Sequence, residues 1–217
     1  MARPVLYVLA GVNGAGKSSV GGYLLEQAGL TWFNPDTFAR EFTAATGCRQ
    51  TEANARAWNE GVRRLDEALT ERRHYAFETT LGGRTIANKL RAAASTHDIL
   101  VWFCGLASAD LHVRRVRARV AAGGHDIPEA KIRERYPKAL LNLIALMPHI
   151  THLQVYDNST EVAAGQAVPD PILVLETKAG TLTWPSRRNR AALRSTPDWA
   201  KPLVEAAIAA AAPRSRS

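Results

Sequence analysis

Hydrophobic and polar residues form two kinds of segment along this chain. Short apolar runs are typical of buried strands, and longer stretches with apolar residues three and four positions apart are typical of amphipathic helices. From residue 4 to residue 160 the two kinds follow one another, which predicts an α/β fold: a parallel sheet with helices on both faces. The predicted strands are 4–10, 30–33, 74–78, 98–106 and 152–159. The predicted helices are 17–27, one from about 37, 51–73, one after Gly83 that ends near 96, 109–121 and 129–147.

Single residues mark several of these boundaries. Thr51 and Ser108 are each predicted to cap the helix that follows, because a side-chain oxygen there can accept a hydrogen bond from a free helical N–H group. Gly82 and Gly83 break the chain between the third strand and the next helix. Pro137 is expected to kink the helix that contains it.

The pattern changes after residue 160. Residues 172–184, ILVLETKAGTLTW, are typical of a β-hairpin that turns at KAGT. An alanine-rich helix is predicted over 197–212, and the last five residues are expected to be disordered. We therefore expect a core at 1–160 with a lid around 119–135, and a hairpin, helix and basic tail at 161–217 that pack on the same domain.

The strand at 4–10 runs directly into a glycine-rich stretch, GVNGAGKS, which we call the P-loop (residues 11–18). Its spacing is that of a phosphate-binding loop, in which backbone N–H groups and the N-terminus of the next helix surround a phosphate. Lys17 is expected to reach the β- and γ-phosphates, and the Ser18 hydroxyl to bind Mg²⁺. The predicted nucleotide-binding residues are Gly11, Asn13, Gly14, Ala15, Gly16, Lys17, Ser18 and Ser19.

Several classes of nucleoside triphosphatase lack their signatures here. The segment NKLR at 88–91 fails the guanine-binding pattern at its last position, and the strand 98–106 does not end in an aspartate. The run LQVYD at 153–157 comes late in the chain, so Asp157 is given a structural or nucleotide-edge role. A small-molecule kinase is the class that the sequence favours.

Two clusters at strand ends supply candidate acceptor-site residues. Asp36 follows the second predicted strand and could take a proton from an acceptor hydroxyl, although the segment around it also suits a helix N-cap. Glu78, Thr79 and Thr80 end the third strand and could hold polar groups of the acceptor, although hydroxyl side chains there also suit a turn.

Arginines are concentrated in the segment 114–135. Arg115 and Arg119 are four residues apart and share a helix face, and Arg133 and Arg135 follow a glycine-containing loop. On a closing lid such arginines can neutralise charge on a transferred phosphoryl group. The alternative is a solvated basic helix pair.

Composition and charge indicate the kind of partner and the cellular location. The chain has 217 residues, 46% of them apolar and 22% charged, and a net charge of +8. This charge suits an anionic partner or a solvated basic face. Cys48 and Cys104 form no metal or redox motif, no signal peptide is expected, and no apolar run is long enough for a membrane span, so a cytoplasmic location is predicted. Part of the basic excess lies near the C-terminus, at Arg187, Arg188, Arg190, Arg194, Arg214 and Arg216.

Histidines and tryptophans receive structural rather than catalytic interpretations. His149 and His152 lack the further ligands of a metal site, so no protein-bound metal cluster is predicted. His125 lies in the expected lid and could be a hinge or a phosphate contact. Trp184 and Trp199 are expected to pack the C-terminal hairpin and helix onto the core.

Five motifs in order resemble the zeta-toxin family of P-loop kinases, in its compact branch. They are GVNGAGKSS at 11–19, NPD at 34–36, FETTL at 77–81, RV..RV..GGHDIPE..I..RY at 115–136 and YDNS at 156–159.

The resemblance implies an adenylate-kinase-like core, ATP or GTP with Mg²⁺ as phosphoryl donor, and an antitoxin protein as partner. It also implies transfer to the 3′-hydroxyl of UDP-N-acetylglucosamine. Carried over by position, Lys17 and Ser18 belong to the nucleotide loop and Asp36 is the catalytic base. Glu78 and Thr80 bind the acceptor, and Arg119 with Arg133 or Arg135 clamps phosphate.

Two other functions stay open on the sequence alone. One is a kinase of another small molecule, such as an antibiotic, a nucleoside or a cofactor. The other is an ATP-binding regulatory or nucleic-acid-binding protein that uses the basic tail, which is disfavoured because basic and aromatic residues do not interleave.

Overall fold

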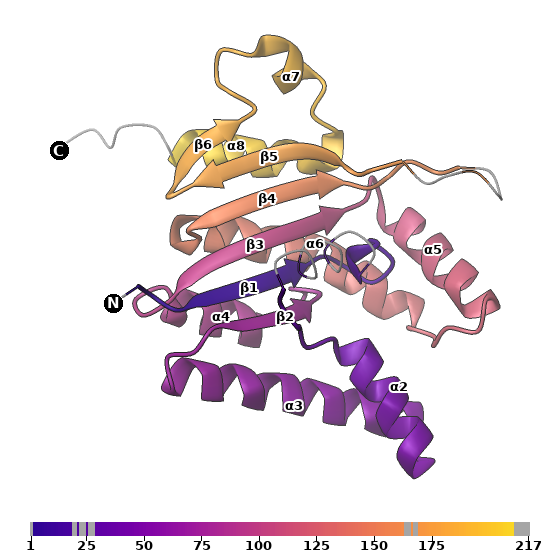
Figure 1. Ribbon diagram of the computed structural model, residues 1–217. Coiled ribbons are helices and arrows are strands. Elements are labelled where there is room, and N and C mark those ends of the chain that lie inside the picture. Colours follow the sequence, from indigo (N-terminus) through magenta and orange to yellow (C-terminus); the bar gives the residue numbers. More distant parts are fainter. Residues whose placement is uncertain are drawn as a thin grey trace.

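A six-stranded sheet organises the computed structural model, which describes residues 2–18, 21, 25, 29–162, 166 and 169–210. The strand order across the sheet is β2-β1-β3-β4-β5-β6, and the first four of these are parallel (Figure 1). β5 and β6 are antiparallel to their neighbours. The α/β class predicted from the alternating pattern is confirmed. The strands are β1 Val5–Ala10, β2 Tyr75–Thr79, β3 Asp98–Gly105, β4 His152–Asp157, β5 Ile172–Lys178 and β6 Thr181–Trp184.

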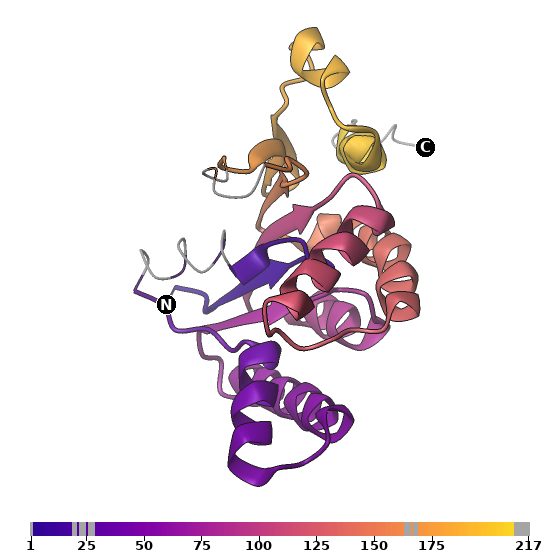
Figure 2. The same cartoon turned by 90° about the vertical axis from the view of Figure 1, so that its right-hand side faces the viewer.

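Helices connect and cover the strands. In Figure 2, α4, α5, α6 and α8 lie on one face of the sheet, and α2 and α3 extend beyond its β2 edge. The helices are α2 Pro35–Thr46, α3 Gln50–Thr70, α4 Arg84–Ala93, α5 Ala109–Ala121, α6 Glu129–Leu146, α7 Arg190–Arg194 and α8 Lys201–Ala210, with 3₁₀ turns at Met147–His149 and Asp198–Ala200.

The core lies between the sheet and the four helices on that face. Leu6, Val8 and Ala10 alternate along β1 and are buried there, together with Ile99 and Phe103 of β3. This alternation follows from strand geometry, in which successive side chains point to opposite faces. On the opposite face, Tyr7 stacks on Trp102 with ring centroids 6.2 Å apart.

That opposite face also receives the start of the helix predicted at 17–27. Gly21 is helical and so close to β1 that a Cβ on it would lie 2.2 Å from Leu9 Cδ1. Leu25 is helical and buried as well. The rest of this predicted helix, with Ser19, lies outside the described residues.

Two predictions around residues 30–51 are wrong. The strand predicted at 30–33 is a single bridge, in which Phe33 pairs with Phe77 of β2. It goes no further because Asn34 caps α2, which begins at Pro35 rather than 37. Thr51 is not a cap, because α3 already begins at Gln50 and no side chain caps it.

Other boundary predictions are confirmed. Ser108 Oγ accepts a hydrogen bond from Leu111 N at 3.2 Å, and α5 begins at the next residue. The hairpin turn between β5 and β6 contains Ala179 and Gly180, both with positive φ, which is the geometry of a tight two-residue hairpin turn.

The C-terminal helix packs on the core as predicted, through its tryptophan. Trp199 lies against Gly105, where a Cβ would come within 2.2 Å of the ring, and its Nε1 donates to Asp157 Oδ1 at 3.1 Å. Of the two roles predicted for Asp157, structural or at the nucleotide edge, this contact is a structural one. Trp184 is partly exposed, and its Nε1 donates to Leu173 O.

Cys104 is buried, and burial raises the pKa of its thiol to about 12, which is the environment of an unreactive cysteine. Among the described residues, no helix combines the length and the apolar character needed to cross a bilayer.

Candidate active site

The P-loop has a backbone that glycine alone can follow at several positions. Gly11, Gly14 and Gly16 all have positive φ, of 141°, 84° and 82°. A Cβ on Gly11 would lie 2.2 Å from Cys104 O, and one on Gly14 would lie 2.8 Å from His112 O. The glycines therefore serve both the left-handed backbone and its close approach to β3 and α5.

Two side chains from distant parts of the chain hold this loop from behind. His112 Nδ1 donates to Asn13 O at 2.9 Å, and Asn158 Nδ2 donates to Ala15 O at 2.9 Å. His112 is 1% exposed, and burial lowers its pKa to about 4, so the ring is neutral at physiological pH. The sequence analysis did not identify either residue as a support of the loop, because no local pattern links them to it.

Glu78 lies at the P-loop. Its Oε1 is 3.3 Å from Lys17 Nζ, and its Oε2 accepts hydrogen bonds from Ser18 Oγ and Asn34 Nδ2, each at 3.0 Å. Lys17 and Glu78 are 6% and 8% exposed. The reason is the sheet register: β2 is the parallel neighbour of β1, and Glu78 pairs with Leu9 just before the loop.

Asp36 lies in the first turn of α2, with its carboxylate free of capping. Asn34 Oδ1 accepts from the N–H groups of Asp36 and Thr37, at 2.9 and 3.1 Å, so Asn34 is the N-cap. The Asp36 side chain is 39% exposed and lies between two residues of the predicted lid. Arg119 Nη1 and His125 Nε2 are each 3.6 Å from one of its oxygens.

The predicted lid arginines point in different directions. Arg135 Nη1 donates to Asn13 Oδ1 at 2.8 Å, so this side chain touches the P-loop. Burial lowers its pKa, and the nearby Asp36 carboxylate opposes that shift. A Cβ on Gly82 would lie 2.6 Å from Arg135 Cγ, so a glycine is needed beside it.

Arg133 differs from Arg135 although it is two residues away. It is exposed and pairs with Asp110 and Glu129 at 2.6 and 2.8 Å. The fold brings Arg135 but not Arg133 to the loop, because residues two apart on a helix point to different sides. The prediction that included Arg133 is corrected in this respect.

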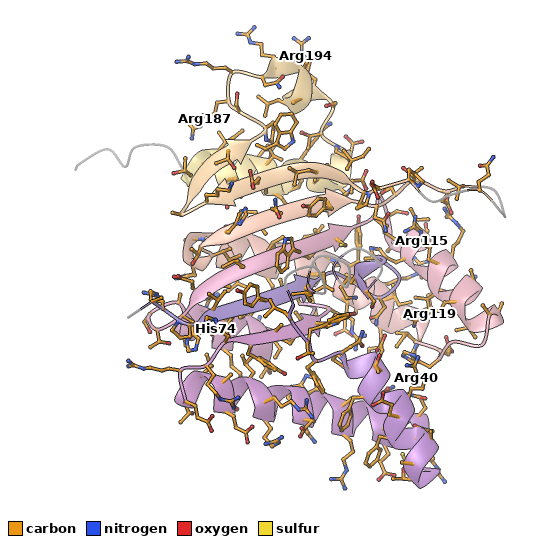
Figure 3. All side chains as sticks on the ribbon, viewed as in Figure 1. Arg40, His74, Arg115, Arg119, Arg187 and Arg194 are labelled. Atoms are coloured by element: carbon orange, nitrogen blue, oxygen red, sulfur yellow. The ribbon has the colours of Figure 1, made fainter. Side chains whose placement is uncertain are left out.

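Arg119 and Arg115 also make different contacts. Arg119 Nη2 donates to His125 O at 3.3 Å, beside Asp36, whereas Arg115 Nη2 donates to Thr160 O at 2.9 Å. Figure 3 shows Arg119 at the α2 end of the molecule. Arg119 Nε and His125 Nε2 are buried without a hydrogen-bond partner. A polar ligand bound at this point could supply the missing hydrogen bonds.

A cavity of about 390 Å³ lies beside the P-loop and Asp36. Asn13, Lys17 and Glu78 line it at the P-loop, and α3, the start of α4 and α6 form its other walls. Thr79 and Thr80 also line it, while their hydroxyls accept hydrogen bonds from Leu81 N and Gly82 N in the turn. Asp36 and Arg135 complete the set of predicted residues that face this cavity.

Two predicted features lie elsewhere. Figure 3 places Arg187 and Arg194 around α7, and Figures 1 and 2 both show α7 at the end of the molecule opposite α2 and α3.

His152 Nε2 is 2.8 Å from Glu176 Oε1, and this bond lowers the pKa of Glu176 to about 2. Within the described ranges, no group of three or more potential ligand side chains could hold a metal ion.

Known structures share this fold. A putative kinase from Chloroflexus aurantiacus aligns with a TM-score of 0.51 and 17% identity, over 62% of this chain and 78% of that chain. The complex AvrRxo1-ORF1:-ORF2 with ATP contains a chain with a TM-score of 0.62 and 12% identity, over 100% and 67% of the two chains. The PezAT chromosomal toxin-antitoxin system of Streptococcus pneumoniae gives 0.54 and 13%, over 72% and 68%.

Some of these proteins are longer than the region that aligns. In a further AvrRxo1 complex, which contains sulphate ions, this chain aligns with 65% of the length of the matched chain. At these identities the likeness shows the fold alone. No curated protein sequence matches the chain. Residues 6–136, which run from β1 through the P-loop to Tyr136 of α6, match the model of a family described as an AAA domain, and the chain therefore belongs to the AAA domain family.

Proposed function

We propose that this protein is a kinase that transfers the γ-phosphoryl group of ATP or GTP to a hydroxyl group of a small molecule. The observation that carries the proposal is the shared cavity: Lys17 and Glu78 of the P-loop side and Asp36 of α2 line the same space. A phosphate-binding loop and a free carboxylate on one cavity are the two parts that such a transfer needs.

The donor would bind at the P-loop, whose glycines keep the backbone open to phosphate oxygens. Lys17 is paired with Glu78 in this structure. When the donor binds, its phosphate oxygens would replace the Glu78 carboxylate as partner of the Lys17 ammonium group. An AvrRxo1 complex with ATP shares the fold, which supports ATP as the donor.

Magnesium fits the oxygen groups beside the loop. Ser18 Oγ and Glu78 Oε2 are 3.0 Å apart, and hydroxyl and carboxylate oxygens are ligands that Mg²⁺ accepts. When bound, Mg²⁺ would neutralise charge on the phosphates. In this interpretation Glu78 belongs to the metal and nucleotide side, and the role in acceptor binding passes to residues farther along the cavity.

In the transfer step, the acceptor oxygen forms a bond to the γ-phosphorus while the bond from that phosphorus to the β–γ bridging oxygen breaks. The bridging electron pair leaves with the nucleoside diphosphate, and the acceptor proton passes to Asp36. Because the transition state is loose, positioning and charge neutralisation contribute most of the acceleration.

Arg119 and Arg135 are placed to stabilise the transferred group. Arg135 already contacts the P-loop, and Arg119 lies beside Asp36 with a buried Nε that lacks a partner. The loop between α5 and α6, within residues 119–135, would act as the lid. Closure would bring both guanidinium groups onto the phosphoryl group.

The acceptor that the motif resemblance implies is UDP-N-acetylglucosamine, and an antitoxin-like protein is the partner that it implies. The likeness to the PezAT toxin-antitoxin system supports the second of these. Each implication of the resemblance can be tested separately, by adding the sugar nucleotide as acceptor and by purifying the tagged protein from its native host and looking for a stoichiometric partner.

The experiment that tests the kinase uses labelled ATP with Mg²⁺ and a panel of hydroxyl compounds, including nucleotide sugars. We expect a new phosphorylated species with the wild-type protein, and loss of it in Lys17→Ala. Lys201→Ala is the matched control, because Lys201 pairs with Asp198 on the surface of α8. Equal transfer by Lys17→Ala and by the wild type would contradict the proposal.

A further inference from the structure

Apolar side chains form part of the cavity wall, and they come from five separate parts of the chain. These apolar residues are Phe33, Ala57, Val62, Phe77, Ile86 and Ile127. The volume of about 390 Å³ is at the small end of the roughly 300–1,000 Å³ that small-molecule sites span.

Trp58 of α3 is the unusual member of this wall. It lines the cavity and yet is 52% exposed, whereas Leu141, Ile172 and Trp184, the other large exposed apolar side chains among the described residues, do not line it. A large aromatic side chain left in solvent at the rim of a cavity is suited to stack on a flat ring.

Small residues beside Trp58 let the neighbouring wall of the cavity approach α3. Ala57 precedes it and Gly61 follows one turn later, and both line the cavity. A Cβ on Gly61 would lie 2.9 Å from Phe33 Cε1, so Gly61 lets the phenyl ring of Phe33 lie against α3. Asn54, one turn before Trp58 on the same side of the helix, adds an amide that can bond to polar ring atoms.

One further pair of charged residues lines this cavity. Lys131 and Glu134 of α6 line the cavity, but their side chains pair with each other at 3.1 Å, and Lys138 also pairs with Glu134. The remaining charged lining residues are Lys17, Asp36, Glu78 and Arg135, which the transfer itself would use. Among the described residues of this wall, a diphosphate on the acceptor would therefore have only Lys131 as a further cation, and it would compete with Glu134 for that ammonium group.

We infer that the acceptor is an alcohol joined to a flat, uncharged ring, with the ring against Trp58 and the hydroxyl toward Asp36. Neutral nucleosides and other heteroaromatic alcohols belong to this class. The inference rests on the proposed kinase function and specifies its substrate class. It favours neutral ring alcohols over diphosphate sugars as acceptors.

The test measures both transfer and binding. Wild-type protein with labelled ATP and Mg²⁺ is given three matched sets of acceptors: neutral nucleosides and pyridine alcohols, UDP-N-acetylglucosamine, and ring-free polyols. We expect labelled product from members of the first set only. Trp58→Ala should then lower kcat/KM for that acceptor about 10-fold, mainly through KM, and Trp58→Phe should restore most of it.

Trp184→Phe is the control variant, because Trp184 is the exposed tryptophan outside the cavity. The acceptor should quench tryptophan fluorescence in the wild type and in Trp184→Phe, but much less in Trp58→Phe. Product from the sugar nucleotide or a polyol would overturn the inference. So would equal rates in the wild type and Trp58→Ala, or a complete lack of binding and transfer with the first set.

Failure of the inference can be told apart from failure of the kinase proposal. ATP binding is followed independently by thermal shift with wild-type protein and Lys17→Ala. If ATP raises the melting temperature of the wild type alone, the donor site stands whatever the acceptor. If it raises neither, the kinase proposal fails first.

Discussion

The two sides of the cavity are built differently. On the P-loop side, Asn13, Lys17, Glu78, His112 and Asn158 are all polar, and none is more than 9% exposed. On the acceptor side, the side chains of Asp36 and Arg119 are 39% and 37% exposed. Trp58 is more exposed still. The buried side is held by hydrogen bonds and packing, whereas the open side has unmet polar atoms.

This difference fits two different demands on the protein. A triphosphate tail is the same in every donor, so its site can be fixed in advance by burial and hydrogen bonds. An acceptor must enter, be recognised and leave, which requires a surface that is incomplete without it. Substitution of a buried polar residue at the loop is therefore expected to lower both stability and phosphoryl transfer. Substitution of an exposed residue is expected to lower transfer alone.

The largest effect should separate two arginines of α6. Arg135→Gln removes the guanidinium that contacts the P-loop, and we expect transfer to fall on the order of 10³-fold, as for arginines that stabilise a phosphoryl group. Arg133→Gln should change it less than about twofold, because Arg133 has only surface ion pairs. Steady-state kinetics of the two variants test this, and an equal loss of transfer in both would contradict the different roles given to Arg135 and Arg133.

The next effect concerns Asp36. Asp36→Asn keeps the shape of the side chain and removes its basicity, so transfer should fall about 10²-fold, which is within the range of general base catalysis. Thermal stabilisation by ATP should be unchanged, because Asp36 is not among the residues that contact the loop. Asp66→Asn, which alters a surface ion pair with Lys89, is the control. If ATP binding were lost together with transfer, Asp36 would belong to the donor side.

His112 gives the buried side a pH dependence. Its pKa is lowered to about 4 in the folded state, below the ordinary value of 6.5, so between these values the unfolded chain binds a proton that the folded chain does not. Stability should therefore fall as pH drops from about 6.5 to 4, by up to about 1.4 kcal/mol per pH unit from this group.

Urea unfolding at several pH values tests this. His112→Gln, whose amide can still donate a hydrogen bond, should flatten the dependence over that range. His149→Gln should not, because His149 is exposed. The same slope in His112→Gln and the wild type would show that His112 does not set it.

The smallest effect is expected at Asn158. Asn158→Ala removes the hydrogen bond to Ala15 O, at a cost of about 1 kcal/mol in unfolding free energy, and should raise the KM for ATP severalfold by loosening the loop. Asn189→Ala removes a cap at the start of α7, far from the loop. It should lower stability by a similar amount and leave KM unchanged. A KM effect in both variants would indicate a general loss of stability.

Much of the fold could be predicted because its signals are local. The P-loop spacing, the cap at Ser108 and the turn at Ala179 and Gly180 each depend on a few consecutive residues. The strand predicted at 30–33 failed because the helix cap at Asn34 follows immediately and ends the pairing with β2 at Phe33. Thr51 failed as a cap because α3 begins before it.

The sequence by itself determined that a strand would lead into a glycine loop and a lysine with the spacing of a phosphate-binding loop, since these neighbours are covalently close. Only the tertiary structure decided which distant groups meet there. It put Glu78 on Lys17 through the pairing of β1 with β2, gave Asn34 the cap and left Asp36 free, and turned Arg135 inward and Arg133 outward. It also placed His112 against the P-loop and Trp58 on the cavity wall, because contacts between residues far apart in the chain depend on how sheet and helices pack, which no short pattern encodes.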